Sequence, residues 1–223
     1  PQGSQMQLYR DFRWGTLASF FVLDTRQYRT DQPCGDQSGP ACDGMLDPNA
    51  TPLGNMQEQW LLDGLGQSIA RWNVIPQQIM MARVDRLPGD AEMLGMDIWS
   101  GYEVARRRLM DFFATRRPAN PIVLTGDIHT NWVNDLQVDY QDDNAPIVAT
   151  EFVGTSISSG GDGTDTRDST AGMLSENPWV KFFNAQRGYV RCVITDEQCV
   201  ADYQVLEYVT RRGSPISTRA SFV

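Results

Sequence analysis

Residues 122–132 read IVLTGDIHTNW and are the most informative segment of the chain. A short apolar strand runs into Gly126 and then presents Asp127 and His129. In α/β sheets, ligands gather at the carboxyl ends of the strands. If the extended backbone continues, residues 127 and 129 point to one side, because side chains alternate with a period of two. A carboxylate beside an imidazole suits a metal ion; the alternative is a turn-capping Asp and a His packed in the core.

The segments before this strand predict alternating strands and helices. Residues 15–24 form an apolar, aromatic strand, and a loop rich in Pro, Gly and Asp covers 31–55. Asn55 and Glu58 have capping-box spacing and predict the start of a helix. Its apolar side continues at 3.6-residue spacing, through Leu61, Leu65, Ile69 and Trp72. Residues 73–83 then predict a buried strand.

A second capping box, Ser100 with Glu103, predicts a helix over 102–117 that Pro118 ends. Leu109 faces the core, and Arg106, Arg107, Arg108 and Arg116 form a solvated face. From residue 132 onward the pattern is β, over 132–140, 147–154, 187–195 and 200–210. The order predicts an α/β core sheet packed on a second, more antiparallel sheet.

Composition excludes several classes of protein. The chain has 223 residues, 41% of them apolar, so it forms a packed core and is neither disordered nor collagenous. Its net charge of −9 disfavours nonspecific nucleic-acid binding, which needs a basic footprint. No apolar run is long enough to span a membrane. His129 is the one histidine, so any catalytic triad or His ligand of this chain must use it.

The four cysteines form two pairs by position. Cys34 and Cys42 are 8 residues apart in a loop, and Cys192 and Cys199 are 7 apart in a hairpin centred on Asp196. In that hairpin the second pair faces across the strands, near the Cα spacing of about 5.5 Å that a disulfide needs. We predict two disulfides and an oxidising compartment. The alternative is four reduced, buried thiols.

Seven blocks in order resemble the alkaline phosphatase D (PhoD-like) branch of the metallophosphoesterases, over nearly the whole chain. The blocks are FFVLDTRQYR (20–29), LGNMQEQWLL (53–62), WNVIPQQIMMAR (72–83), MDIWSGY (96–102), LTGDIHTNW (124–132), VATEFVGTSISS (148–159) and FFNAQRGYVR (182–191). The resemblance implies a metallophosphoesterase-like α/β sandwich, with two packed mixed sheets flanked by helices.

The resemblance also implies a metal-dependent hydrolase of small phosphate esters, exported by the twin-arginine route and therefore secreted or periplasmic. Calcium and ferric iron are the implied cofactors. Asp127 and His129 match the family's GDxH metal motif, with His129 a ligand or the proton donor to the leaving alkoxide. The family's other ligands lie in an N-terminal half with a WDDHE-type block, which this chain lacks. Residues 1–223 therefore resemble the C-terminal portion of a single domain, inactive by itself.

Five further residues are candidates for substrate binding or for supporting the metal ligands. Ser100 stands where similar proteins usually have the Asp of WDGY, and Asp97 is a rival acid. Glu151 orients a ligand or pairs with a buried Arg. Arg26 binds phosphate or forms an ion pair with Asp24. Asn131 is expected to form a pocket wall.

Two other functions stay open. One is a phospholipase D-type phosphodiesterase, because relatives of this type cleave phospholipid head groups. The other, from a different class, is a non-catalytic, disulfide-stapled extracellular binding module.

Overall fold

A computed structural model describes residues 6–142 and 144–223. Its helices are α1 (Asn55–Gln67), α2 (Glu103–Arg116) and α3 (Thr170–Glu176), with 3-10 turns at Asp43–Leu46 and Trp99–Tyr102. Its strands are β1 (Arg10–Trp14), β2 (Ala18–Val22), β3 (Ser38–Gly39), β4 (Trp72–Pro76), β5 (Leu94–Gly95), β6 (Pro121–Thr125), β7 (Asn131–Gln137), β8 (Ile147–Val153), β9 (Gly163–Thr164), β10 (Val180–Ile194), β11 (Cys199–Leu206) and β12 (Ile216–Phe222).

The strands pair in the order β1-β2-β4-β6-β8-β7-β10-β11-β12, and β9 joins β10. β2, β4, β6 and β8 are parallel, and the other pairs along this path are antiparallel. The predicted mixed α/β class is confirmed. The parallel strands carry near-continuous apolar residues, as expected where both faces of a sheet are covered.

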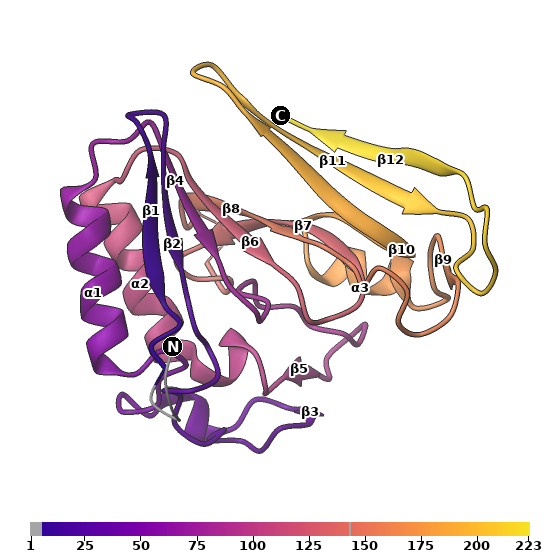
Figure 1. Ribbon diagram of the computed structural model, residues 1–223. Coiled ribbons are helices and arrows are strands. Elements are labelled where there is room, and N and C mark those ends of the chain that lie inside the picture. Colours follow the sequence, from indigo (N-terminus) through magenta and orange to yellow (C-terminus); the bar gives the residue numbers. More distant parts are fainter. Residues whose placement is uncertain (1–5, 143) are drawn as a thin grey trace.

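Helices α1 and α2 cover one face of this sheet (Figure 1). Leu61 and Leu65 of α1 and Leu109 of α2 are buried in one core with Val123 of β6 and Val153 of β8. Burying each such side chain stabilises the fold by roughly 1.5–3 kcal/mol.

The opposite face is covered by β10, β11 and β12, which arch back over the strands (Figure 1). The first part of β10 pairs with β7, and from Arg187 onward it pairs with β11. Gly188 lies after this change of partner, where a Cβ atom would come within 1.9 Å of the Gln204 carbonyl oxygen, so only glycine fits. Ile122 and Phe152 of the main sheet pack against Tyr203 of β11. The predicted second, more antiparallel sheet is present only as a layer, because β10, β11 and β12 are antiparallel but continue the same 10-stranded sheet through the pairing of β10 with β7.

Three local predictions are wrong. Gly54, with a φ of 71°, is the N-cap of α1, so Asn55 is its first helical residue. Ile69 lies beyond the helix and is 83% exposed. The strand expected over 73–83 leaves the sheet after Pro76, although Met80 remains buried. Periodicity placed the elements, but not the residues at which they end.

The expected capping by Ser100 is also wrong, and so is the solvated position expected for Arg106, whereas Arg116 is exposed as predicted and Arg107 and Arg108 are partly exposed. Ser100 lies in a 3-10 turn, fully buried, and its hydroxyl has no hydrogen-bond partner among the described residues. Arg106 is fully buried as well. Its guanidinium donates to both oxygens of Glu103, at 2.9 and 2.7 Å, and to two backbone carbonyls. These bonds compensate for burying the charge.

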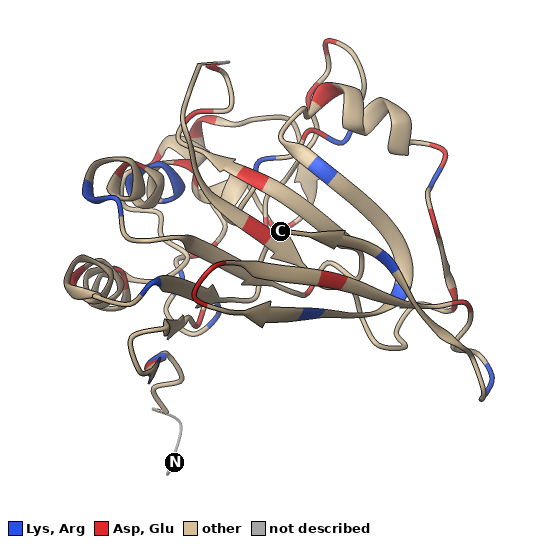
Figure 2. Cartoon of the chain, turned by 90° about the horizontal axis from the view of Figure 1, so that it is seen from above, with Lys and Arg blue, Asp and Glu red and all other residues tan. Residues whose placement is uncertain are grey.

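The charged residues form no basic stripe in the view of Figure 2, where Lys and Arg are interspersed with Asp and Glu. That distribution agrees with the net charge of −9. Within residues 6–142 and 144–223, no helix combines the length and the apolar character that a membrane span requires.

Candidate functional site

The candidate site lies where the parallel strands β2 and β6 end. The loop after β2 carries Arg26 and Arg29, and the turn after β6 carries Asp127 and His129. Parallel strands place their carboxyl ends at one edge of the sheet, which brings these distant segments together. Arg26 and Asp127 are 101 residues apart in sequence, yet their side chains form an ion pair of 3.2 Å.

The turn after β6 is strained rather than extended. Asp127 and His129 have φ values of 67° and 59°, in the left-handed region. Such residues cost about 1–3 kcal/mol each and cluster at functional sites. Arg187 holds the turn by donating to the carbonyl oxygen of His129 at 2.5 Å. The expected extended backbone is therefore wrong, but Asp127 and His129 are both exposed while Thr130 is buried.

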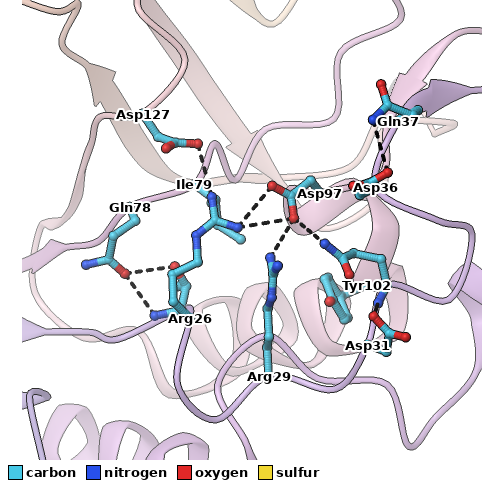
Figure 3. Close-up of polar contacts among 12 residues, drawn as sticks. Arg26, Arg29, Asp31, Asp36, Gln37, Gln78, Ile79, Asp97, Tyr102 and Asp127 are labelled. Carbon is cyan, nitrogen blue, oxygen red and sulfur yellow. Dashed lines mark hydrogen bonds and ion pairs between the residues drawn. The ribbon is translucent and has the colours of Figure 1, made fainter.

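Arg26 bridges two carboxylates, as the close-up in Figure 3 shows. Its guanidinium donates to both oxygens of Asp97, at 3.1 and 3.0 Å, and to Asp127. The guanidinium of Arg26 therefore forms no ion pair with Asp24. Asp24 instead accepts hydrogen bonds from the backbone N–H groups of Arg26 and Gln27, both at 3.0 Å. Asp24 shapes the loop after β2, and Arg26 reaches across the site.

Asp97 gathers the basic side chains of this site. Arg29 donates to it at 2.5 Å and Gln32 at 2.6 Å, in addition to Arg26. Partial burial raises the pKa of Asp97, but hydrogen bonds from Arg26, Gln32 and Arg29 outweigh that effect, so its pKa is lower than usual. Asp97 is thus an ionised anchor for two arginines. Sequence reasoning missed Arg29, although it lies in the same block as Arg26.

Glu151 of β8 is completely buried behind the site. Its carboxylate accepts bonds from the backbone N–H groups of Met81 and Ala82, at 2.7 and 3.0 Å, and from Thr125 and Asn134, at 2.7 and 3.0 Å. Burial raises its pKa, and these four bonds oppose the rise. The expected alternative partner, a buried Arg, is wrong. Glu151 ties the segment after β4 to the last residue of β6, directly before the Asp127 turn.

Asn131, which was expected to form a pocket wall, is buried and joins neighbouring segments through its side-chain hydrogen bonds. Its side chain donates to Asn184 at 3.0 Å and accepts the backbone N–H of Thr155 at 3.0 Å. It connects the start of β7 with β10 and with the loop that follows β8.

The buried Ser100 likewise presents no oxygen at the surface, whereas the side chain of Asp127 is 51% exposed.

A complete metal centre is not formed by the described residues alone. Nowhere in residues 6–142 and 144–223 do three or more His, Cys, Asp or Glu side chains form a group that could hold a metal ion. Asp127 and His129 supply one carboxylate and one imidazole, which suit a metal ion in type but not in number. Further donors are needed.

Of the two predicted disulfides, one is confirmed and the other is wrong. Cys34 and Cys42 form a disulfide with a Cα separation of 6.2 Å, as predicted. Cys192 and Cys199 are free, which corrects the second pairing. The register sets Cys192 opposite Ala201 and Cys199 opposite Ile194, so the two cysteines are diagonal neighbours and not a facing pair. A hydrogen bond to Cys199, together with burial, raises the pKa of the Cys192 thiol.

The structure therefore gathers an acid and two arginines at the carboxyl ends of the parallel strands, with the one histidine in the same turn as the acid. The chain belongs to the PhoD-like phosphatase family, whose model matches residues 1–203. It is 50% identical over all 223 residues to alkaline phosphatase D of Bacillus subtilis (strain 168) and spans 38% of that protein. It also superposes on a solved structure described as "Structure of PhoD", with a TM-score of 0.95 and 50% identity, covering 100% of this chain and 42% of that one.

Proposed function

We propose that this chain contributes to the metal-dependent hydrolysis of phosphate esters, as a phosphomonoesterase or phosphodiesterase. The observation that carries the proposal is the strained turn that carries the exposed Asp127 and His129, in which Asp127 forms an ion pair with Arg26. The family membership and the name of the Bacillus relative support the same reaction class.

Asp127 and His129 would hold the metal, and calcium and ferric iron are the ions we propose. When bound, such an ion supplies Lewis-acid activation of the phosphoryl group. Arg26 would donate hydrogen bonds to phosphoryl oxygens, because a guanidinium matches their geometry. His129, if not a ligand, would give its proton to the leaving alkoxide oxygen.

The ion pair between Arg26 and Asp127 does not prevent this arrangement. The two side chains are 36% and 51% exposed. Ion pairs of this kind contribute only about 0–1 kcal/mol. Asp127 can therefore exchange the guanidinium for a metal ion at little cost, while Asp97 keeps Arg26 in place through two hydrogen bonds.

We further propose that residues 1–223 are the C-terminal portion of one domain whose remaining part supplies the other metal donors. The chain spans about two fifths of the relatives it matches, which supports this division. The disulfide between Cys34 and Cys42 supports an exported, secreted or periplasmic protein.

The test compares the chain alone with a fusion in which it replaces the matching part of the Bacillus relative. We expect the chain alone to hydrolyse little p-nitrophenyl phosphate or its bis-ester with calcium and iron supplied. In the fusion, Asp127→Asn and His129→Gln should each lower kcat/KM by about 10²–10⁴-fold. Both variants should also reduce metal uptake in calorimetry.

Asp111→Asn, an exposed acid on α2, is the matched control and should leave turnover and metal uptake unchanged. Unchanged metal uptake after both site substitutions would overturn the assignment. Ligand binding without turnover, in both the chain and the fusion, would favour the non-catalytic module instead.

A further inference from the structure

A cavity with a mixed polar and apolar lining begins at the turn that carries Asp127 and His129. It has a volume of about 200 Å³ and is lined by Ile128 and Thr130, the neighbours of His129 in the turn after β6. Arg86, from the loop after β4, and Arg167, from the segment before α3, also line it. Nothing in the proposed reaction requires these two arginines.

The two guanidinium groups have no acidic partner. Within residues 6–142 and 144–223, neither Arg86 nor Arg167 forms an ion pair with a carboxylate. Arg86 donates to the hydroxyl of Ser38 at 3.1 Å. The guanidinium of Arg167 lies 5.8 Å from the centre of the Phe183 ring.

Acids close to these arginines in sequence are not paired with them, and Asp168, directly after Arg167, forms no ion pair within residues 6–142 and 144–223. Asp85 accepts the backbone N–H groups of Leu87 and Met93, at 3.0 and 2.9 Å. Asp165 is bound to Arg219 at 2.6 Å. Two unneutralised cations therefore face one cavity in a protein whose net charge is −9.

Arg86 is half-buried and Arg167 is exposed, so solvent screens part of their repulsion and a bound anion would neutralise the rest. Burial, and after it the positive charge of Arg167, lower the pKa of Arg86. An anion between the two guanidiniums would remove their mutual repulsion and accept charge-assisted hydrogen bonds. The other walls are apolar or carry hydroxyls, and they include Trp132, Phe183, Ser169 and Thr170. These walls suit an anionic group attached to a small organic body.

We propose that this cavity binds a second anionic group of the substrate, while the phosphoryl group to be hydrolysed lies at Asp127, His129 and Arg26. The inference rests on the proposed function and narrows it to phosphate esters that carry another phosphate or carboxylate a few atoms away. Arg86 and Arg167 are then specificity-determining residues.

The test is a binding measurement that needs no turnover. Calorimetry on the 223-residue chain, at constant ionic strength, compares methylphosphonate with propane-1,3-diphosphonate, neither of which is hydrolysed. We expect the diphosphonate to bind at least tenfold more tightly. Arg86→Gln and Arg167→Gln should each remove most of that preference, because each deletes a charge-assisted donor. Arg116→Gln, on the far end of α2, is the matched control and should keep it.

A second measurement avoids the risk that a variant misfolds. Phenylglyoxal modifies accessible arginines, and mass spectrometry locates the modified positions. The diphosphonate should protect Arg86 and Arg167 in the wild-type chain and leave Arg116 unprotected. Equal affinity for the two phosphonates, or no protection of either cavity arginine, would overturn the inference. Diphosphonate preference with no hydrolysis by the fusion would support the subsite and contradict the proposed function.

Discussion

Replacing Glu151 with glutamine should destabilise the protein modestly, and replacing it with alanine should destabilise it severely. The reason is that all four partners of this buried carboxylate are hydrogen-bond donors. A glutamine has the same shape but exchanges one acceptor oxygen for an NH₂ group. The loss of unfolding free energy in Glu151→Gln depends on which of the four donors can find another acceptor.

The magnitude follows from the two oxygens taken separately. The Oε1 atom accepts from Met81 and Thr125, and a glutamine oxygen placed there keeps both bonds. The Oε2 atom accepts from Ala82 and Asn134. The Oδ1 atom of Asn134 is buried and has no hydrogen-bond partner in the part of the chain that the structure describes, so the Asn134 amide can rotate and accept from the new NH₂ group. The N–H of Ala82 alone is left unpaired, which costs about 1–3 kcal/mol.

Alanine leaves both backbone N–H groups unpaired, those of Met81 and Ala82. At about 1–3 kcal/mol for each, the cost is roughly 2–6 kcal/mol before the loss of packing is added. That is a large part of the stability of a typical domain, about 5–15 kcal/mol. Urea unfolding at pH 7, followed by circular dichroism, measures both variants. Glu197→Gln, an exposed glutamate, is the control and should stay within about 0.5 kcal/mol of wild type.

The change of this stability difference with pH gives an independent check of the direction in which the pKa of Glu151 is shifted. Because the folded-state pKa of Glu151 is raised, its contribution to stability is fully present below the ordinary pKa and declines as the pH rises toward the raised value. The stability gap between wild type and Glu151→Gln should therefore narrow from pH 4 to pH 7. A gap that widens, or a glutamine variant as unstable as the alanine variant, would refute this reasoning.

Other predictions concern Asp97 and the cysteines. The pKa of Asp97 is lowered in the folded state, so its ionised carboxylate stabilises the protein at pH values above the ordinary pKa of Asp. This stabilisation is lost as the pH falls through the folded-state pKa. Asp97→Asn should therefore make stability depend less on pH below about pH 4. Replacing Cys34 and Cys42 with serine should lower the unfolding free energy by about 2.5 kcal/mol, the chain-entropy value for their separation of 8 residues. Thiol titration of unreduced, denatured protein should find two free thiols, Cys192 and Cys199; four would contradict the disulfide, and none would restore the second pairing.

Local patterns in the sequence predicted several elements of this protein correctly. Apolar runs identified β4 and β6, and 3.6-residue spacing identified α1 and α2. The polar residues directly after β6 marked the candidate site, because a strand must end where polar side chains and a glycine interrupt the apolar run. The short loop between Cys34 and Cys42 also sufficed to predict their disulfide.

Only the tertiary structure decided which distant groups meet. Arg26 reaches Asp97 and Asp127, 71 and 101 residues away, because the order β2-β4-β6 brings these loops together. A register offset of two residues separates Cys192 from Cys199. Glu151 accepts hydrogen bonds from N–H groups and the Thr125 hydroxyl and not from an arginine, and the buried Arg106 pairs with Glu103 instead. Periodicity is a property of neighbouring residues, whereas partners across the sheet depend on strand order and register, which no local pattern contains.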